Sequence, residues 1–202
     1  MSERRDGATL DTVRDVRAAL QEGIALRQEL AATMSEAIAD CADRIASALF
    51  GGGKLLLCGN GGSAADCQHI AAELTGRFRA NREALAAISL TTDTSALTAI
   101  ANDFGFEQVF ARQVEALGRA GDVLLAVSTS GRSPNVLQAA RMARGRGLYV
   151  IALTGPKADA LGELADLVLT VPGLTTDRIQ ELHITIGHIV CDLIERRCGE
   201  GR

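Results

Sequence analysis

The sequence predicts an α/β fold, namely a three-layer α/β/α sandwich around a five-stranded parallel sheet. Two observations lead to this prediction: short apolar runs alternate with segments of helical periodicity, and small polar residues follow several of the runs. Strands buried in parallel sheets are near-continuous apolar runs, and regular strand–helix alternation places helices on both faces of the sheet. The predicted strands span residues 54–58, 85–90, 122–128, 148–154 and 167–171.

The first fifty residues carry the apolar stripe of an amphipathic helix. Apolar residues recur at spacings of three and four from Leu10 to Leu49, which indicates one or two long helices. Three consecutive glycines at 51–53 end them, because glycine readily adopts the conformation that closes a helix. We expect residues 1–50 to form a helical arm that packs against another subunit, as part of the same domain, and residues 51–202 to form the sheet-based domain.

Composition and charge exclude several classes of protein. The chain has 202 residues, 47% of them hydrophobic, and a formal net charge of −4, so it lacks the broad basic surface of nucleic-acid-binding proteins. No apolar run approaches the roughly 18 residues of a membrane span, and the N-terminus lacks the apolar core of a signal peptide. Five cysteines without CxxC spacing indicate a reducing compartment. We expect a cytoplasmic protein that binds neither nucleic acid nor membrane.

Two loops that follow predicted strands are candidate ligand sites, because ligands of such sheets bind outside the carboxyl ends of the strands. The glycine-rich loop 59–63 follows the first strand, and the serine-rich loop 128–133 follows the third. The second loop enters a helix with Pro134 near its first position, so its hydroxyls and backbone amides suit a phosphate monoester. A capped turn without a ligand is the alternative interpretation.

The first loop also matches the dinucleotide fingerprint GxGxxA, through Gly59, Gly61 and Ala64. A dinucleotide-binding fold needs an acidic residue at the end of the second strand, about 20 residues further on. The candidate acid, Asp93, lies about 30 residues away. This spacing argues against a nicotinamide cofactor.

All three histidines lie in two predicted helices. His69 and Glu73 are four residues apart on the helix after the first loop, so they share one helix face. The last helix carries Gln180, His183 and His188. The alternative for each histidine is a structural role in its helix, without a part in catalysis. For His183, which shares the face of Gln180 or packs at a subunit contact, we favour a structural role.

Four segments of the chain resemble the phosphoheptose isomerases of the sugar isomerase (SIS) superfamily. They are CGNGGSAADCQHIAAELTGRF, NDFGFEQVF, RQVEALGRAGDVLLAVSTSGRSPNV and DRIQELHITIGHIVCDLIE. The resemblance extends to about residue 196 and implies the flavodoxin-like SIS fold. It also implies an enzyme that converts sedoheptulose 7-phosphate into D-glycero-D-manno-heptose 7-phosphate through an enediol. That reaction is the first step of heptose biosynthesis for lipopolysaccharide or other surface glycans.

The resemblance implies roles for individual residues. Glu73 is the expected base and His188 the expected acid. The family's assembly is a homotetramer with sites at subunit contacts, and its metal is one zinc ion per subunit, held here by His69, Glu73, Gln180 and His188. Because Gln180 and His188 are about 12 Å apart along one helix, both reach one ion only with nearly extended side chains. The implied substrate-binding residues are Asn60, Gly61, Gly62, Ser63, Glu73, Asn102, Asp103, Ser128, Thr129, Ser130, Ser133, Asp177 and Gln180.

Two other functions are alternatives at this point. Non-catalytic SIS adaptors that bind the replication initiator keep the fold but differ at the last-helix histidine, so the presence of His188 favours catalysis. Isomerases of other phosphosugars, such as arabinose 5-phosphate, usually carry regulatory modules after the SIS domain. We expect no such modules in these 202 residues. No sequence pattern indicates the number of carbons in the sugar.

Overall fold

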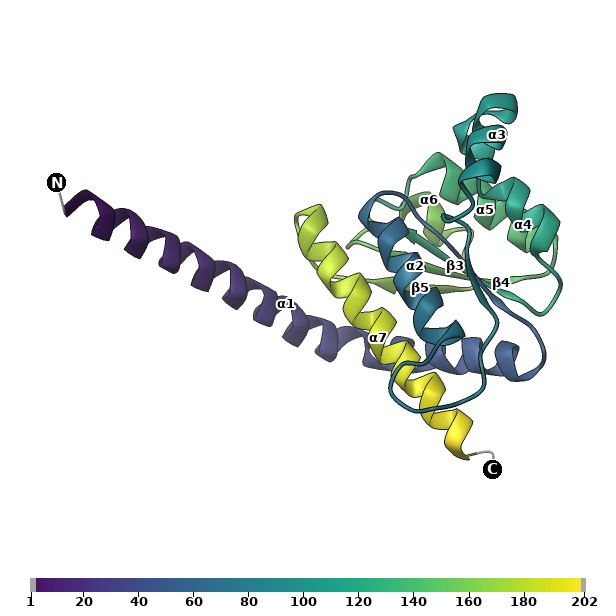
Figure 1. Ribbon diagram of the computed structural model, residues 1–202, viewed down its shortest axis with the longest axis horizontal. Helices are drawn as coiled ribbons and strands as arrows, with labels where there is room; N and C mark the ends of the chain where they lie inside the picture. Colours follow the sequence, from purple (N-terminus) through teal and green to yellow (C-terminus); the bar gives the residue numbers. More distant parts are fainter. Residues whose placement is uncertain (1–2, 201–202) are drawn as a thin grey trace.

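The computed structural model describes residues 3–200, and it describes side chains for residues 11–198. The fold has three layers, with helices on both faces of a central sheet (Figure 1). The termini of the two predicted domain ranges, 1–2 and 201–202, lie outside the described residues. In chain order the elements are α1 (Glu3–Phe50), β1 (Leu55–Cys58), α2 (Gly62–Thr75), β2 (Ala87–Ser89), α3 (Thr94–Phe104), the 3-10 helix η1 (Phe106–Gln108), α4 (Ala111–Leu117), β3 (Val123–Ser128), α5 (Pro134–Gly145), β4 (Tyr149–Thr154), α6 (Asp159–Gly162), β5 (Leu167–Thr170) and α7 (Thr176–Glu200).

The five predicted strands form one parallel sheet in the order β2-β1-β3-β4-β5. Strand β1 lies between β2 and β3, and its Leu55 pairs with Ala87 of β2 on one side and with Val123 of β3 on the other. This order confirms the predicted flavodoxin-like fold. The chain moves outward from β1 to β2 and then returns to β3 on the opposite side. The carboxyl ends of β1 and β3 therefore flank the switch point at which such sheets bind ligands.

Successive residues of each strand point to opposite faces of the sheet and bury two separate cores. Leu55 and Leu57 of β1 lie in the core that α1, α2 and α7 cover. Leu56 lies in the second core, which α4, α5 and α6 cover. Unbroken apolar runs were therefore the correct signal for β1, β3 and β4, because both faces of these strands are buried, whereas Ile88 of the edge strand β2 is 39% exposed.

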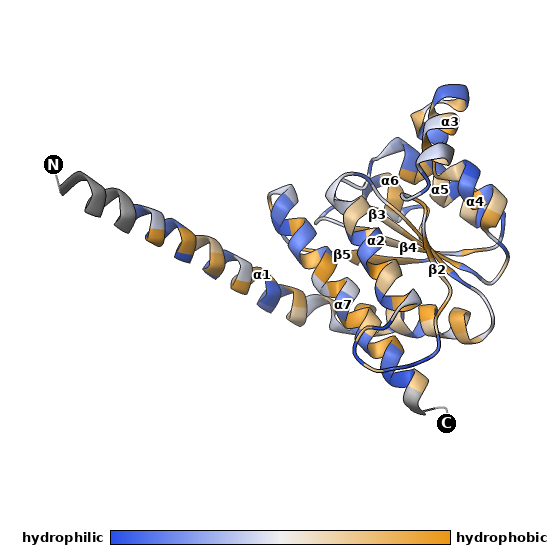
Figure 2. Ribbon diagram, viewed as in Figure 1, coloured by the Kyte–Doolittle hydropathy of each residue, from blue (hydrophilic) through white to orange (hydrophobic). Residues whose placement is uncertain are grey.

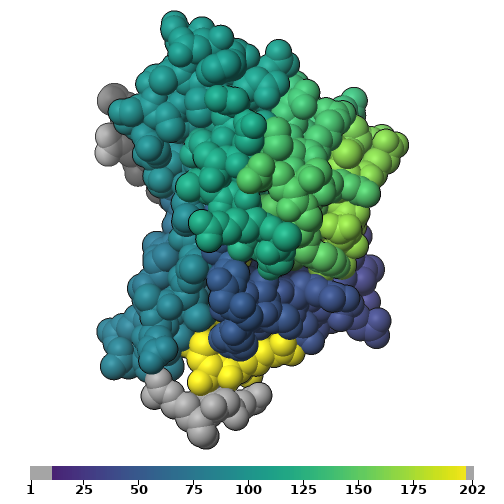
Figure 3. Space-filling view, turned by 90° about the vertical axis from the view of Figure 1, so that its right-hand side faces the viewer, coloured from purple at the N-terminus to yellow at the C-terminus, as the bar shows by residue number. Residues whose placement is uncertain are grey.

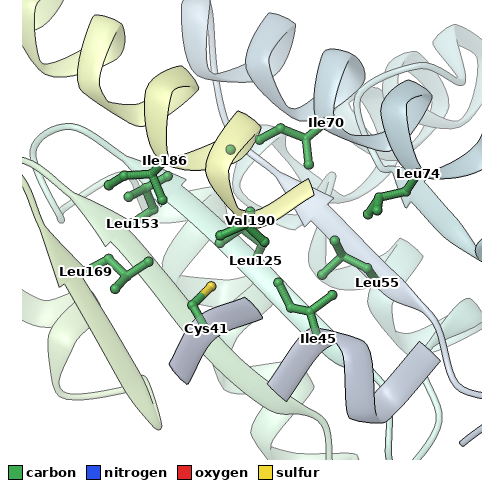
Figure 4. A pocket seen from close by; sticks show the side chains of 11 residues that line it. Cys41, Ile45, Leu55, Ile70, Leu74, Leu125, Leu153, Leu169, Ile186 and Val190 are labelled. Carbon is green, nitrogen blue, oxygen red and sulfur yellow. The ribbon is translucent and has the colours of Figure 1, made fainter. Parts of the chain in front are cut away.

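Figure 4 shows how the first core closes over the sheet. Ile45 from α1, Leu74 from α2 and Val190 from α7 converge above Leu125 and its neighbours on the strands. The cavity among these side chains measures about 10 Å³ and its lining is apolar, with Gly187 as the one position without a side chain. An apolar gap of this size is a feature of core packing and does not bind a polar ligand.

A single helix, α1, accounts for the whole N-terminal stripe. Its second half packs in the first core through residues from Leu30 to Leu49, whereas its first half projects from the body of the molecule (Figure 1). Hydrophobic residues recur along the projecting half (Figure 2), and the largest of them are 43% to 64% exposed: Val13, Val16, Leu20 and Ile24. The side chain of Leu10, which begins the stripe, lies outside the described residues. Within the described residues, even this 48-residue helix falls short of the apolar character that crossing a membrane requires.

Candidate functional site

Two loops meet at the switch point of the sheet. The first, residues 59–61, connects β1 to α2, and Gly61 has a φ of 56°, a backbone conformation that favours glycine. The second, residues 128–133, connects β3 to α5, which begins with a proline as predicted. The side-chain amides of Asn60 and Asn135 exchange two hydrogen bonds of 2.8 Å. This pair ties the first loop to the helix that follows the second.

The second loop gathers hydroxyl groups beside a hollow of about 430 Å³. The Ser128 and Ser133 hydroxyl oxygens lie 3.0 Å apart, and the Ser130 hydroxyl accepts a hydrogen bond from the backbone N–H of Arg132. Hydroxyls at the start of a helix are groups that bind phosphate, because the helix N-terminus carries partial positive charge. The hollow has the size of a small-molecule site. Its lining consists of Asn60, Phe106, Glu107, Ser133, Pro134 and Asn135.

His69, Glu73 and His188 form one cluster, although they come from two helices far apart in the sequence. His69 Nε2 lies 3.3 Å from Glu73 Oε1 and 2.8 Å from His188 Nε2. The two imidazole rings meet edge-on, with centroids 5.0 Å apart. One ligand atom from each of the three residues lies within 4.8 Å of the others. Two imidazole nitrogens and a carboxylate oxygen form a donor set that zinc accepts, so the cluster has the chemistry of a metal site.

The cluster forms because α2 and α7 lie side by side and run in the same direction (Figure 1). Near the start of both helices, the Gln180 amide lies so close to Gly62 that a Cβ at position 62 would be 2.5 Å from Oε1. Further along, a Cβ at Gly187 would be 2.7 Å from Cδ1 of Ile70. Glycine at these two positions lets the helices approach closely. His69 directly precedes Ile70 and His188 directly follows Gly187, so the second contact brings the two histidines together.

Other predicted site residues lie apart from this cluster in the single subunit. Asn102 and Asp103 lie exposed on α3, where the Asn102 amide donates a 2.8 Å hydrogen bond to the Asp103 carboxylate. Asp177 lies in the first turn of α7, where a hydrogen bond from the Thr175 side chain lowers the pKa of its carboxyl. Ser63 is buried at the start of α2. The substrate-binding roles of these residues stay predictions.

Asp93, the acid weighed for a dinucleotide site, caps a helix. Its carboxylate accepts a 2.9 Å hydrogen bond from the backbone N–H of Ala96 at the start of α3. A capping role satisfies one of the free donors of a helix N-terminus. This geometry agrees with the sequence spacing, which argued against a nicotinamide cofactor.

Sequence reasoning missed two polar residues beside the site. Asn135 is buried, and besides pairing with Asn60 it accepts a hydrogen bond from the N–H of Val136. Asp66 lies one turn before His69 on α2, and burial raises the pKa of its carboxyl while the nearby His69 opposes that shift. The one available signal for Asn135 was an amide directly after Pro134 at a helix start. Asp66 carried no signal beyond its place on the helix after the glycine loop.

Known proteins similar to this chain share most of its length. Residues 20–155 match the family described as SIS domain. A phosphoheptose isomerase from Helicobacter hepaticus is 56% identical over 168 residues, which cover 83% of this chain and 86% of the relative. The solved phosphoheptose isomerase from Neisseria gonorrhoeae superposes with a TM-score of 0.86 at 48% identity, covering 92% of this chain and 99% of that one. A phosphoheptose isomerase structure from Francisella tularensis gives a TM-score of 0.88 at 39% identity, covering 92% and 98%.

Proposed function

This chain belongs to the phosphoheptose isomerases of the SIS domain family, and we propose that it interconverts sedoheptulose 7-phosphate and D-glycero-D-manno-heptose 7-phosphate. One observation carries the proposal for this site. Glu73 and His188, which lie on different helices, offer ligand atoms within 4.8 Å of each other. A base and an acid at this separation can act on two adjacent carbons of one sugar.

The reaction moves a carbonyl group from C2 of the ketose to C1. Glu73 takes the proton from C1, the released electron pair forms the C1–C2 double bond, and His188 donates a proton to the oxygen on C2. Glu73 then returns its proton to C2, and His188 accepts the proton of the C1 hydroxyl as the aldehyde forms. Both side chains end in their starting states, as general acid–base catalysis requires.

The phosphate group positions the reacting carbons from a distance. Hydroxyls of Ser128, Ser130 and Ser133, with Thr129 in the same loop, supply its proposed site. Gly62, at the start of α2, and His69 are separated by about 10 Å along the helix axis. When the loops hold the phosphate, an extended seven-carbon chain therefore spans this distance and brings its C1 and C2 near Glu73. Binding energy from this remote group then contributes to orientation at the reacting carbons.

We infer that His69, Glu73 and His188 hold one zinc ion per subunit, with Gln180 as the expected fourth ligand. The donor types and the 4.8 Å spacing of the three clustered residues support this inference. A bound zinc ion would supply Lewis-acid stabilisation of the negative charge that develops on the sugar oxygens. Glu73 has two competing roles in this arrangement, because a carboxylate that binds a cation is less available to accept a proton.

A turnover assay combined with metal analysis tests the function. We expect the purified chain to convert sedoheptulose 7-phosphate and to contain about one zinc ion per subunit. Chelation should lower turnover by at least about tenfold, and added zinc should restore it. A folded, zinc-loaded protein that turns over no sedoheptulose 7-phosphate would contradict the isomerase assignment. Capture of a replication initiator without turnover would instead support the adaptor function.

We also infer that the enzyme is a homotetramer in which neighbouring subunits complete the sites. The exposed apolar stripe on the projecting half of α1 supports this inference, because monomers rarely expose a continuous apolar face. Asn102 and Asp103 add support, since the predicted substrate ligands on α3 lie apart from the cluster in one subunit. A second copy of the chain is the expected occupant of the stripe.

Two charges placed in the stripe should dissociate the assembly. In the variant Leu20→Glu/Ile24→Glu, we expect light scattering after size exclusion to report a smaller species. Burying a carboxylate without a partner in an apolar interface is strongly unfavourable. The control is Ala18→Glu, an exposed position on the opposite side of the same helix, which should leave the assembly intact. An unchanged mass in the double variant would show that the stripe is not the subunit contact.

We place the protein in the cytoplasm, and its cysteines support this location. All five are free thiols, and four of them are buried: Cys41, Cys58, Cys67 and Cys191. Burial raises the pKa of Cys41 and Cys58 to about 12. Such thiols behave as small apolar core residues, as the sequence predicted, and do not form a disulfide framework.

A further inference from the structure

A buried carboxylate holds the loop that follows α2 against α7. Glu195 lies seven residues after His188 on α7, so it projects from nearly the same side of the helix. Its two oxygens accept hydrogen bonds from the backbone N–H groups of Phe78 (2.9 Å), Arg79 (2.7 Å) and Ala80. Figure 3 shows this segment beside the C-terminal part of α7. Three backbone donors on one carboxylate fix the course of the loop.

Arg82 connects the same carboxylate to the end of α2. Its Nε lies 3.2 Å from Oε2 of Glu195, and the two side chains are only 6% and 7% exposed. Its guanidinium also donates hydrogen bonds to the carbonyl oxygens of Glu73 (2.7 Å) and Leu74 (2.8 Å). Carbonyls in the last turn of a helix have no partner within it, and a cation there is favoured by the helix dipole. Arg82 therefore binds the backbone of the residue that we assign as the base.

The loop also reaches the other member of the acid–base pair. The ring of Phe78, whose N–H is bound by Glu195, lies against the ring of His188 with centroids 5.7 Å apart and planes tilted by 35°. His188 is therefore in contact with Phe78 on one side and with His69 on another. Its ring position depends on where the loop lies.

The ion pair has the properties of a fixed structural unit. Burial alone would raise the pKa of Glu195, but the backbone donors and Arg82 outweigh that effect and lower it, so the carboxylate stays charged. Arg82 is suited to this position, since the planar guanidinium reaches a carboxylate and two carbonyls at once, whereas a lysine ammonium is a point charge on a flexible stem. Removing either partner leaves the other charge buried and uncompensated.

We propose that Arg82 and Glu195 form a brace that sets the separation of Glu73 and His188, and that both are positioning residues for the isomerisation. The brace links the backbone of Glu73 on α2 to the helix of His188 and, through Phe78, to the His188 ring. It lies at the C-terminal end of α2, whereas the contact of Gly62 with Gln180 lies at the N-terminal end. This inference rests on the proposed function, because it assigns the two catalytic roles to Glu73 and His188.

The test compares Glu195→Gln and Arg82→Lys with a matched control, Asp122→Asn. Asp122 is also a buried acid that accepts backbone N–H bonds, from Lys54 and Arg119, and pairs with a cation, but these partners lie outside α2, α7 and the loop that follows α2. We expect all three variants to melt at lower temperature than the wild type. At a temperature where all are folded, Glu195→Gln should lower kcat by at least about tenfold with KM within about threefold. Asp122→Asn should change neither, because it contacts neither helix of the acid–base pair through its hydrogen bonds or its ion pair.

A spectroscopic readout separates this proposal from the proposed function. The chain has three histidines, so the imidazole proton signals are few and can be assigned by substitution. Loss of the brace should shift the His188 signals, because the Phe78 ring moves, while Asp122→Asn should leave them unchanged. Wild-type protein without turnover would contradict the proposed function alone. Unchanged His188 signals and unchanged kcat in both brace variants would overturn the brace. If Glu195→Gln does not fold, a comparison of Arg82→Lys with Glu195→Asp tests the brace instead. In that comparison Glu195→Asp should keep more activity than Arg82→Lys.

Discussion

Replacing Glu73 by glutamine should lower the turnover of sedoheptulose 7-phosphate by about 10²–10⁴-fold, the usual contribution of a positioned general base. Glutamine keeps the size of the side chain but cannot accept a carbon-bound proton. His188→Gln should cause a loss of similar size, since the proposed mechanism has the imidazole exchange protons with the sugar oxygens. The measurement is kcat at saturating substrate, with folding checked by circular dichroism. KM should change less than kcat, because the phosphate loop is untouched.

The double variant distinguishes a shared step from two separate contributions. If Glu73 and His188 act in one proton-transfer sequence, the double variant should be hardly slower than either single variant, because groups that act as a unit are non-additive. Glu83→Gln is a matched control, since it removes an exposed carboxylate close to α2 in the chain. Full activity in either Glu73→Gln or His188→Gln would remove that residue from the mechanism. Loss of activity in Glu83→Gln would indicate an unspecific effect.

Most of the fold was predictable because its signals are local. The strands β1, β3 and β4 are apolar runs with both faces buried, so composition alone marks them, and the structure shortens the five predictions by a few residues at most. The second strand, predicted at 85–90, forms only over Ala87–Ser89. Periodicity could not decide between one and two helices before residue 50, because a stripe has the same spacing in both. The structure contains one uninterrupted helix.

The site was less predictable, because its geometry depends on how α2 packs on α7. Spacing placed His69 and Glu73 on one helix face, but only the family resemblance linked them to His188. The close approach of the helices depends on Gly62 and Gly187, whose importance appears only once the opposite side chains are known. Arg82 and Glu195 gave no signal at all. In the sequence they are ordinary charged residues of a loop and a helix end, and burial alone distinguishes them.

His183 should make the protein lose stability in mild acid. Its side chain is buried on α7, where the Thr154 backbone is a weak hydrogen-bond partner and neither ring nitrogen makes a well-formed hydrogen bond to the described residues. Burial lowers its pKa to about 4, against an opposing effect of the Thr154 backbone. Its ordinary pKa is about 6.5, so between these two values the unfolded chain binds a proton that the folded chain does not. Stability then rises with pH across this window and is lost as the pH falls through it.

Substituting this residue should flatten the stability profile in mild acid. From about pH 7 to about pH 4.5, the wild type should lose about 2–3 kcal/mol more unfolding free energy than His183→Leu, which has no group to protonate. Urea unfolding at several pH values measures the difference, and the acidic residues common to both proteins cancel. The control Val190→Ala removes buried apolar volume from the same helix, so it should lower stability equally at every pH. Parallel pH profiles for the wild type and His183→Leu would show that this imidazole becomes protonated without unfolding the protein.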